Sequence, residues 1–192
     1  NHLGNRNIQV FIKLIQTKFE KENFMNIIEK DFENLIFNKY GVFVLNEAMK
    51  NFAPENLISL VSFIDNNIIK ICSDVNGIIL FNFYLLRIKV TDCFEYSKKL
   101  VLNTISSNLS ELILDKYGIH CISFILNNYH ESEIYILIEQ IQENNSPFNI
   151  TLGGVIWKVV NRHINFLTCN EFSETLALHP ATHAHAHTCF VF

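Results

Sequence analysis

A polar side chain recurs at one position in five similar phrases of this 192-residue chain. Amide, hydroxyl and ammonium groups form hydrogen bonds readily, so a set of them on one surface can recognise the edges of unpaired bases. Taken singly, each of these side chains is equally well an ordinary solvated helix flank. Five of them in register, in otherwise very apolar phrases, favour a shared binding surface made of Gln9, Asn46, Asn82, Ser123 and Lys158.

Flat side chains stand three residues earlier in several of the phrases. Arg6, Phe43 and His120 present planar faces on which unpaired bases stack, at about 1–3 kcal/mol per base. The matching residues Ile79 and Val155 are poor substitutes, because they have no planar face. Partial packing in the core is the alternative explanation for Phe43 and His120.

The residue before each flat position hydrogen-bonds through its side chain in the first phrase only. That residue is Asn5, and its counterparts are Val42, Ile78, Ile119 and Gly154. An aliphatic side chain cannot hydrogen-bond a base edge. Only the first phrase therefore places two hydrogen-bonding side chains, Asn5 and Gln9, on one helix surface beside Arg6.

Each phrase begins with a glycine, and these glycines organise the whole chain. The glycines are Gly4, Gly41, Gly77, Gly118 and Gly153, and successive ones are 37, 36, 41 and 35 residues apart. Self-similarity with a period of a few tens of residues indicates a solenoid of stacked repeats. Stacking would bring the polar and flat side chains of successive phrases into one strip.

Apolar residues in the phrases follow the helical spacing i, i+3, i+4, i+7, which places them on one helix face. In the first phrase this stripe consists of Ile8, Phe11, Ile12 and Ile15. The same register predicts burial of Ile12, Leu45, Leu85 and Ile122.

Further helical segments lie between the phrases. Pro54 suits a first helical turn, and the apolar residues from 57 to 64 that follow it share one face. Short apolar segments just before Gly41 and Gly118 indicate one more short helix per repeat. Because the many β-branched residues follow helical and not alternating periods, the predicted fold class is all-α.

The phrases NHLGNRNIQVFIK, NKYGVFVLNEAMK and DKYGIHCISFILNN resemble the second helix of Pumilio (PUF-type) repeats. In that family an aspartate or asparagine and an aromatic residue precede the glycine. The resemblance covers residues 1–168, as four repeats and a truncated fifth. It implies a right-handed superhelical solenoid of three-helix repeats, each of about 36 residues, whose concave face binds single-stranded RNA at about one base per repeat.

The resemblance also implies roles for single residues. In the family, asparagine and glutamine at the positions of Asn5 and Gln9 read uracil, while the residue at the position of Arg6 stacks on the base. The implied partner is single-stranded RNA bound by a monomer, and protein partners on the convex face are a second expectation. The implied RNA-binding residues are Asn5, Arg6, Gln9, Phe43, Asn46, Asn82, His120, Ser123 and Lys158.

The biological role implied by the resemblance is post-transcriptional regulation of mRNA in the cytoplasm. An alternative is ribosomal RNA maturation in the nucleolus, which tolerates looser sequence readout. A protein-binding scaffold of the HEAT or armadillo type is the rival from another class, because repeat geometry alone does not separate it. The chain starts without methionine, just before a repeat glycine, and is expected to be a piece of a longer array.

The overall charge runs against strong RNA binding. The chain has 15 Lys and Arg residues and 19 Asp and Glu residues, whereas a phosphate-binding surface needs a basic excess. Residues 1–52 hold seven basic and six acidic side chains, and the remainder holds eight and thirteen. This distribution predicts that binding weakens toward the C-terminus.

Motifs for other functions are missing from the sequence. It contains no phosphate-binding glycine loop, nucleophile elbow or metal-binding helix motif, so we expect neither an enzyme nor a cofactor. The five widely spaced cysteines fit a reducing compartment, and no apolar run reaches the roughly 18 residues of a membrane span. Residues 169–192 lose the repeat pattern, and the alternating His183, His185 and His187 do not share a helix face. We expect a disordered tail without metal.

Overall fold

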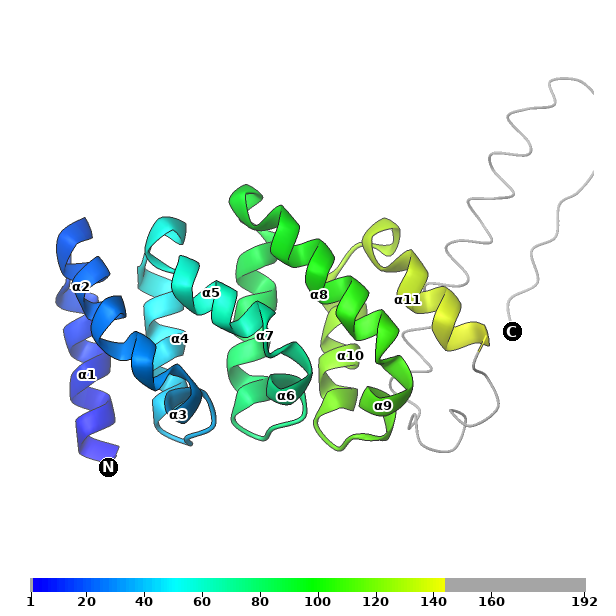
Figure 1. Ribbon diagram of the computed structural model, residues 1–192, viewed down its shortest axis with the longest axis horizontal. Helices are drawn as coiled ribbons and strands as arrows, with labels where there is room; N and C mark the ends of the chain where they lie inside the picture. Colours follow the sequence, from blue (N-terminus) through cyan, green and yellow to red (C-terminus); the bar gives the residue numbers. More distant parts are fainter. Residues whose placement is uncertain (1, 144–192) are drawn as a thin grey trace, which may run out of the picture.

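The computed structural model describes residues 2–143, and every regular element in that range is a helix. The longer helices occur in pairs, each pair joined by a short connection (Figure 1). Their bounds are α1 His2–Leu14 and α2 Lys18–Ile28, α4 Gly41–Asn51 and α5 Ile58–Asp65, α7 Gly77–Lys89 and α8 Glu95–Ser107, and α10 Gly118–Asn128 and α11 Glu131–Glu143.

A short helix precedes each pair from the second onward. These short helices are α3 Phe32–Ile36, α6 Ile68–Cys72 and α9 Leu109–Leu114. The remaining regular elements of the described residues are three 3-10 turns, η1 Glu29–Asp31, η2 Pro54–Asn56 and η3 Asp92–Phe94. The predicted short helices before Gly41 and Gly118 are confirmed, and a third lies before Gly77. The predicted helix start at Pro54 is confirmed as a 3-10 turn that leads into α5.

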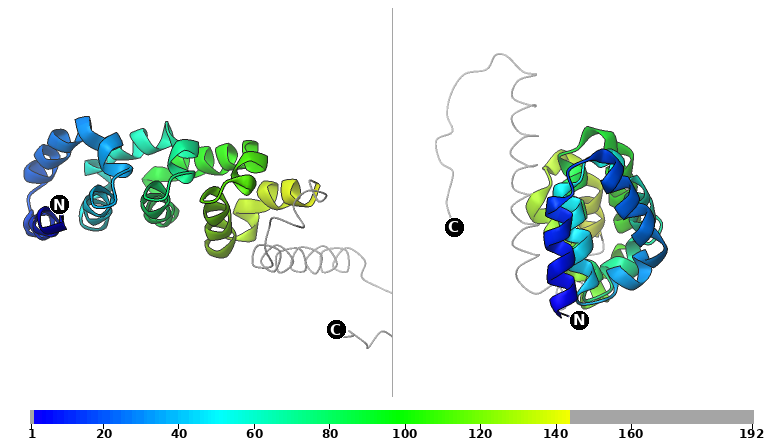
Figure 2. Two further views of the ribbon diagram at one scale, coloured as in Figure 1. Left: turned by 90° about the horizontal axis from the view of Figure 1, so that it is seen from below. Right: turned by 90° about the vertical axis from the view of Figure 1, so that its left-hand side faces the viewer.

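The helices form two parallel rows along the array. One row consists of α1, α4, α7 and α10, which we call the reader helices, and the other consists of α2, α5, α8 and α11 (Figure 2). Each unit of a short helix, a reader helix and an outer helix is one repeat, so the predicted solenoid of three-helix repeats is confirmed. The expected fifth repeat and the histidine-rich tail lie outside the described residues.

The repeated glycines are required by close approach of the backbone. A Cβ atom added to Gly41 would lie 2.6 Å from the carbonyl oxygen of Leu35, and one added to Gly118 would lie 2.7 Å from that of Leu112. A Cβ on Gly77 would meet the oxygen of Ile71 more closely still. The reader helices α4, α7 and α10 therefore each begin against the backbone of the short helix before them. Around Gly4 the same position is open, with no atom within 4 Å.

The acidic or amide residue three positions before each glycine shapes the connection. Asn38 Oδ1 accepts hydrogen bonds from the backbone N–H groups of Tyr40 (2.8 Å) and Gly41 (3.0 Å). Asp74 and Asp115 each accept the same pair of bonds, from the residue before the reader helix and from the glycine that begins it. Side chains of this type commonly close turns in this way. Every connection consequently enters its reader helix along the same path.

The apolar stripes of the reader helices form one core with the outer helices. Ile12, Leu45, Leu85 and Ile122 are completely buried, as predicted. Ile8 and Phe11, which share the apolar stripe of the first phrase, are not buried, since their exposed fractions are 42% and 56%. Their counterparts on α4 and α7 lie on helices that have a reader helix on either side, whereas α1 stands at the end of the described array and has a neighbouring reader helix on one side only (Figure 1).

Polar contacts tie the third repeat to the second. The hydroxyl of the buried Tyr84 on α7 donates to Asp65 at the end of α5. The Ser97 hydroxyl on α8 donates to the other carboxylate oxygen of Asp65, at 2.7 Å. Burial, followed by the bond to Asp65, raises the pKa of Tyr84 well above its ordinary value. One carboxylate thus joins an outer helix to the next reader helix and its outer partner.

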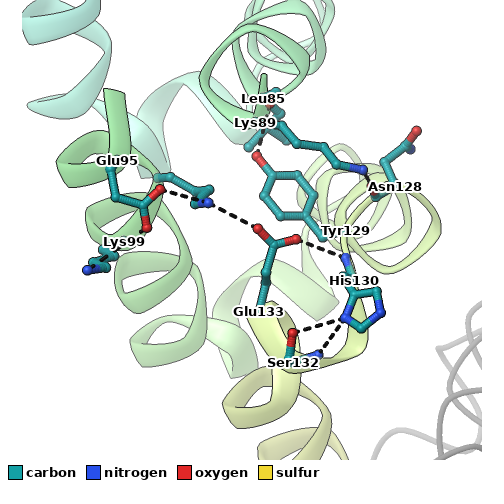
Figure 3. A network of polar contacts seen from close by, with 10 residues as sticks. Leu85, Lys89, Glu95, Lys99, Asn128, Tyr129, His130, Ser132 and Glu133 are labelled. Atoms are coloured by element: carbon teal, nitrogen blue, oxygen red, sulfur yellow. Dashed lines mark hydrogen bonds and ion pairs between the residues drawn. The ribbon is translucent and has the colours of Figure 1, made fainter. Parts of the chain in front are cut away.

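A second network joins the third repeat to the fourth (Figure 3). Glu133 on α11 accepts hydrogen bonds from the backbone N–H of His130 (3.0 Å) and from Lys98 on α8 (3.1 Å). Lys98 also pairs with Glu95 at 2.8 Å. Burial acts to raise the pKa of Glu133, but these hydrogen bonds outweigh it and hold the pKa below the ordinary value. The ionised form of Glu133 therefore stabilises the fold.

This arrangement predicts a pH-dependent effect of Glu133→Gln. Because the folded-state pKa of Glu133 is lowered, its stabilisation is complete above the ordinary value of 4.5 and is lost as the pH falls through the folded-state value. We expect the variant to be less stable than the wild type by up to about 1 kcal/mol at pH 7, and we expect this deficit to be smaller at pH 3. Urea unfolding at both pH values measures this, with the exposed Glu111→Gln as a control for loss of charge. An equal deficit at both pH values would contradict the assignment.

None of the helices described between residues 2 and 143 is long and apolar enough to cross a bilayer.

Candidate nucleic-acid interface

The first two reader helices enclose a cleft that brings several predicted site residues together. The cleft has a volume of about 360 Å³. We call it the first cleft, and its lining is Asn5, Arg6, Gln9, Lys39, Tyr40 and Phe43. Amide, cationic and aromatic side chains, the three types that recognise an unpaired nucleotide, thus meet in one hollow.

The two amide side chains of the first cleft are hydrogen-bonded to each other. Gln9 Nε2 donates a hydrogen bond to Asn5 Oδ1 at 3.0 Å, as helical spacing of four residues allows. Both side chains are half-buried, whereas Arg6 between them is exposed. The amide hydrogens of Asn5 and the oxygen of Gln9 are left over, so the pair offers a donor and an acceptor to a ligand.

The opposite wall of the first cleft is aromatic and basic. Phe43, two residues into α4, is 43% exposed and keeps a free face. Lys39 places its Nζ 4.8 Å from the ring centre of Tyr40. A base between Arg6 and Phe43 would have a flat group on either side. The first cleft therefore has the parts of a nucleotide site.

In the second repeat the predicted reader lies deeper than the pattern indicated. Asn46 is only 2% exposed, because its helix α4 is flanked by α1 and α7 (Figure 1). Neither its Nδ2 nor its Oδ1 atom has a hydrogen-bond partner in the fold. Buried amides are almost always paired, and an unpaired one costs about 1–3 kcal/mol. An external partner that reached Asn46 would remove that cost.

The remaining predicted residues occupy matching positions in the third and fourth repeats. Asn82 is half-buried, and its Oδ1 is buried without a partner. His120 is exposed and Ser123 half-buried on α10, with the amide of Asn127 donating to the backbone oxygen of Ser123 at 2.7 Å. Lys158 lies outside the described residues. The structure places the described readers on one row of helices, but only the first repeat has two interacting polar readers.

The charges are divided between the two rows. The four reader helices contain five basic residues, Arg6, Lys13, Lys50, Arg87 and Lys89, and one acidic residue, Glu47. Glu47 is largely buried and pairs with Lys13 at 3.5 Å. The rest of residues 2–143 contains eight basic and sixteen acidic residues. The acidic net charge therefore belongs to the other elements, and the reader row carries the basic excess that phosphate binding requires.

Two residues of the first cleft were missed in the sequence. Lys39 and Tyr40 precede Gly41 in the sequence. They come close to Arg6 only because α1 and α4 pack side by side. The signal that identifies them is the recurrence of Lys and Tyr before Gly118, as Lys116 and Tyr117.

No group of three or more metal-binding side chains occurs among the residues that the structure describes. Cys72 and Cys121 are both buried free thiols, and Cys72 Sγ donates a hydrogen bond to Cys121 Sγ at 3.6 Å.

Solved structures share this arrangement of helices. A Puf4 mutant bound to the Cox17 RNA 3′ UTR recognition sequence matches with a TM-score of 0.69 and 14% identity, over 91% of this chain and 55% of that chain. The RNA-binding domain of yeast Puf5p bound to MFA2 RNA matches with a TM-score of 0.68 and 18% identity, over 88% and 48%. PUF-8 in complex with PBE-RNA gives 0.61 and 16%, over 92% and 62%.

The similarity to these structures lies in the fold. No protein-family profile matches the chain, and no curated protein matches it in sequence. The chain spans 48–62% of the length of the three solved chains. The Pumilio-type solenoid expected from the glycine phrases is confirmed, in a strongly diverged sequence.

Proposed function

We propose that this divergent Pumilio-type array binds single-stranded RNA along its reader helices and recognises a uracil in the first cleft. The fold supports this proposal, because solved chains with the same arrangement of helices are bound to RNA. The basic excess of the reader row supports it as well. Binding is non-covalent and needs no cofactor.

The observation that carries the proposal is the hydrogen bond between Gln9 and Asn5. It leaves a donor on Asn5 and an acceptor on Gln9 side by side. Uracil presents an acceptor oxygen next to its N3–H donor, so the two edges are complementary. Arg6 stacks on the base and attracts phosphate, and Phe43 closes the other side of the cleft.

We further propose that the protein acts on mRNA after transcription, in the cytoplasm. The support is that one of the solved chains of this fold is bound to a recognition sequence from a 3′ UTR. The aliphatic residues Val42, Ile78 and Ile119 limit base reading in the later repeats. Looser readout of that kind also suits maturation of ribosomal RNA in the nucleolus, and locating the tagged protein in cells separates the two roles.

The proposal predicts the effect of replacing both Asn5 and Gln9 by alanine. Binding to a short RNA with one uracil should weaken by about 1–3 kcal/mol, by analogy with paired contacts to base edges in DNA. The preference for uracil over the other three bases should be lost at one position only. Fluorescence anisotropy with four RNAs that differ at that position measures both quantities.

Two further variants make this test specific. Asn26→Ala with Asn103→Ala removes two exposed amides from the outer helices α2 and α8, and should leave binding unchanged. Arg6→Ala should weaken all four RNAs alike, since stacking and charge are insensitive to the base edge. If Asn5 and Gln9 can be replaced with no change in affinity or preference, the first repeat does not read RNA. If the wild type binds no RNA at low salt, a protein-binding scaffold becomes the better interpretation.

A further inference from the structure

Two lysines occupy equivalent places in front of reader helices. Lys39 lies in the connection Asn38-Lys39-Tyr40-Gly41, and the fourth repeat has the same connection with Lys116. The turns around them are alike, because Asn38 and Asp115 each accept hydrogen bonds from the two backbone N–H groups that follow the lysine. The backbone therefore presents both lysines in the same way.

Each of the two lysines is held over an aromatic ring. The Nζ atoms of Lys39 and Lys116 lie 4.8 Å and 5.2 Å from the ring centres of Tyr40 and Tyr117. This contact restricts a flexible side chain and leaves its charge in place. Both side chains belong to exposed residues.

Neither lysine is neutralised by a carboxylate in the part of the chain that the structure describes. The ion pairs of the outer and short helices instead occupy Lys18, Lys70, Lys98 and Lys99, each with a glutamate. Lys39 and Lys116 thus keep a full positive charge available to an anion.

The surroundings of Lys39 indicate which anion this is. Lys39 lines the first cleft together with the amides of Asn5 and Gln9. If the amides hold a base edge, the phosphates of that strand run along the wall of the same cleft. A lysine ammonium acts there as a point charge toward phosphate.

The third repeat has the same turn without the lysine. Asp74 accepts the two backbone hydrogen bonds, but the next residues are Val75 and Asn76. The Asn76 amide donates to the backbone oxygen of Phe37 at 3.0 Å. This connection therefore contacts the second repeat and presents no cation. The cationic positions therefore alternate, in the second and fourth repeats.

We infer that Lys39 and Lys116 are phosphate anchors for single-stranded RNA, two repeats apart, and that the third repeat has no such anchor. The inference rests on the proposed function and adds to it a contact that is independent of base identity. At about one base per repeat, the two anchored phosphates are about two nucleotides apart along the strand.

The test is the salt dependence of RNA binding. Each phosphate contact to a single strand contributes about 0.7 to the slope of log affinity against log salt. We expect Lys39→Ala and Lys116→Ala each to reduce the slope by about 0.7. Between 50 and 200 mM salt each variant would then lose about 2.6-fold less affinity than the wild type. Base preference should not change, and Lys39→Arg should retain the wild-type slope.

Lys70→Ala is the matched control. Lys70 is also exposed and also lies over a ring, 5.0 Å from the centre of Phe37, but it pairs with Glu33 on the short helix α3. Its replacement removes the same charge and should leave the slope unchanged. If Lys39→Ala, Lys116→Ala and Lys70→Ala all give the same slope of log affinity against log salt, the inference is overturned. This holds whether that common slope equals the wild-type slope or is smaller, and the proposed function is not affected. A wild type that binds no RNA at low salt would overturn both.

Discussion

Replacing Leu45 by alanine is expected to lower the free energy of unfolding by about 2–5 kcal/mol, the usual cost of a cavity in a packed core. Leu45 is completely buried in α4. Its helix lies between α1 and α7, so the loss affects the contacts of a central repeat with both of its neighbours (Figure 1). Denaturant unfolding followed by circular dichroism measures the change.

Leu114→Ala is the control for Leu45, because it is the same chemical change at the end of α9. The Leu114 residue is 71% exposed, and its replacement should cost no more than about 0.5 kcal/mol. Similar losses from the two variants would mean that Leu45 does not occupy the core position that the repeat register gives it.

Gly41→Ala is expected to destabilise the array by about 3 kcal/mol, at the upper end of the usual cost of overpacking. The added Cβ would lie 2.6 Å from the carbonyl oxygen and 2.7 Å from the Cα of Leu35. Both are backbone atoms, which a side-chain rotation cannot move away. To accept the methyl group, α3 and α4 must separate. The free energy of unfolding measures the cost, and RNA affinity should fall with it, since Lys39 and Phe43 flank this contact.

The same substitution at Gly4 should not lower the free energy of unfolding. No atom lies within 4 Å of the position of its Cβ, and alanine favours a helix over glycine by up to about 1 kcal/mol. Gly4→Ala is therefore expected to be neutral or slightly stabilising. A penalty at Gly4 equal to that at Gly41 would show that helix-start geometry, and not contact with a short helix, requires the glycines.

The elements of the fold could be predicted because they depend on local spacing. The stripe through Leu45 and the proline at residue 54 identify helices without knowledge of their neighbours. The interval between glycines then identifies the stacking. The burial of Asn46 could not be predicted in the same way, because it depends on two helices that flank α4 from either side.

The candidate site was predictable in part for a related reason. Asn5, Arg6 and Gln9 stand within one helix, and helical spacing alone brings them together. Lys39 joins them across the gap between two repeats, and that contact has no local signature. The net charge of the chain was misleading, because a sum over residues does not record which row of helices carries each charge.

The division of charge between the rows affects how many strands one molecule can hold. A protein with cations on opposite sides can link two nucleic acids, and many such molecules condense RNA into networks. Here the reader row has five basic residues and one acidic residue, whereas the outer helices α2, α5, α8 and α11 have four basic residues and eight acidic ones. If the array binds RNA as proposed, the acidic outer helices repel a second polyanion, so we expect each molecule to hold one RNA strand. Such an array would coat a transcript one molecule after another without crosslinking it to another transcript.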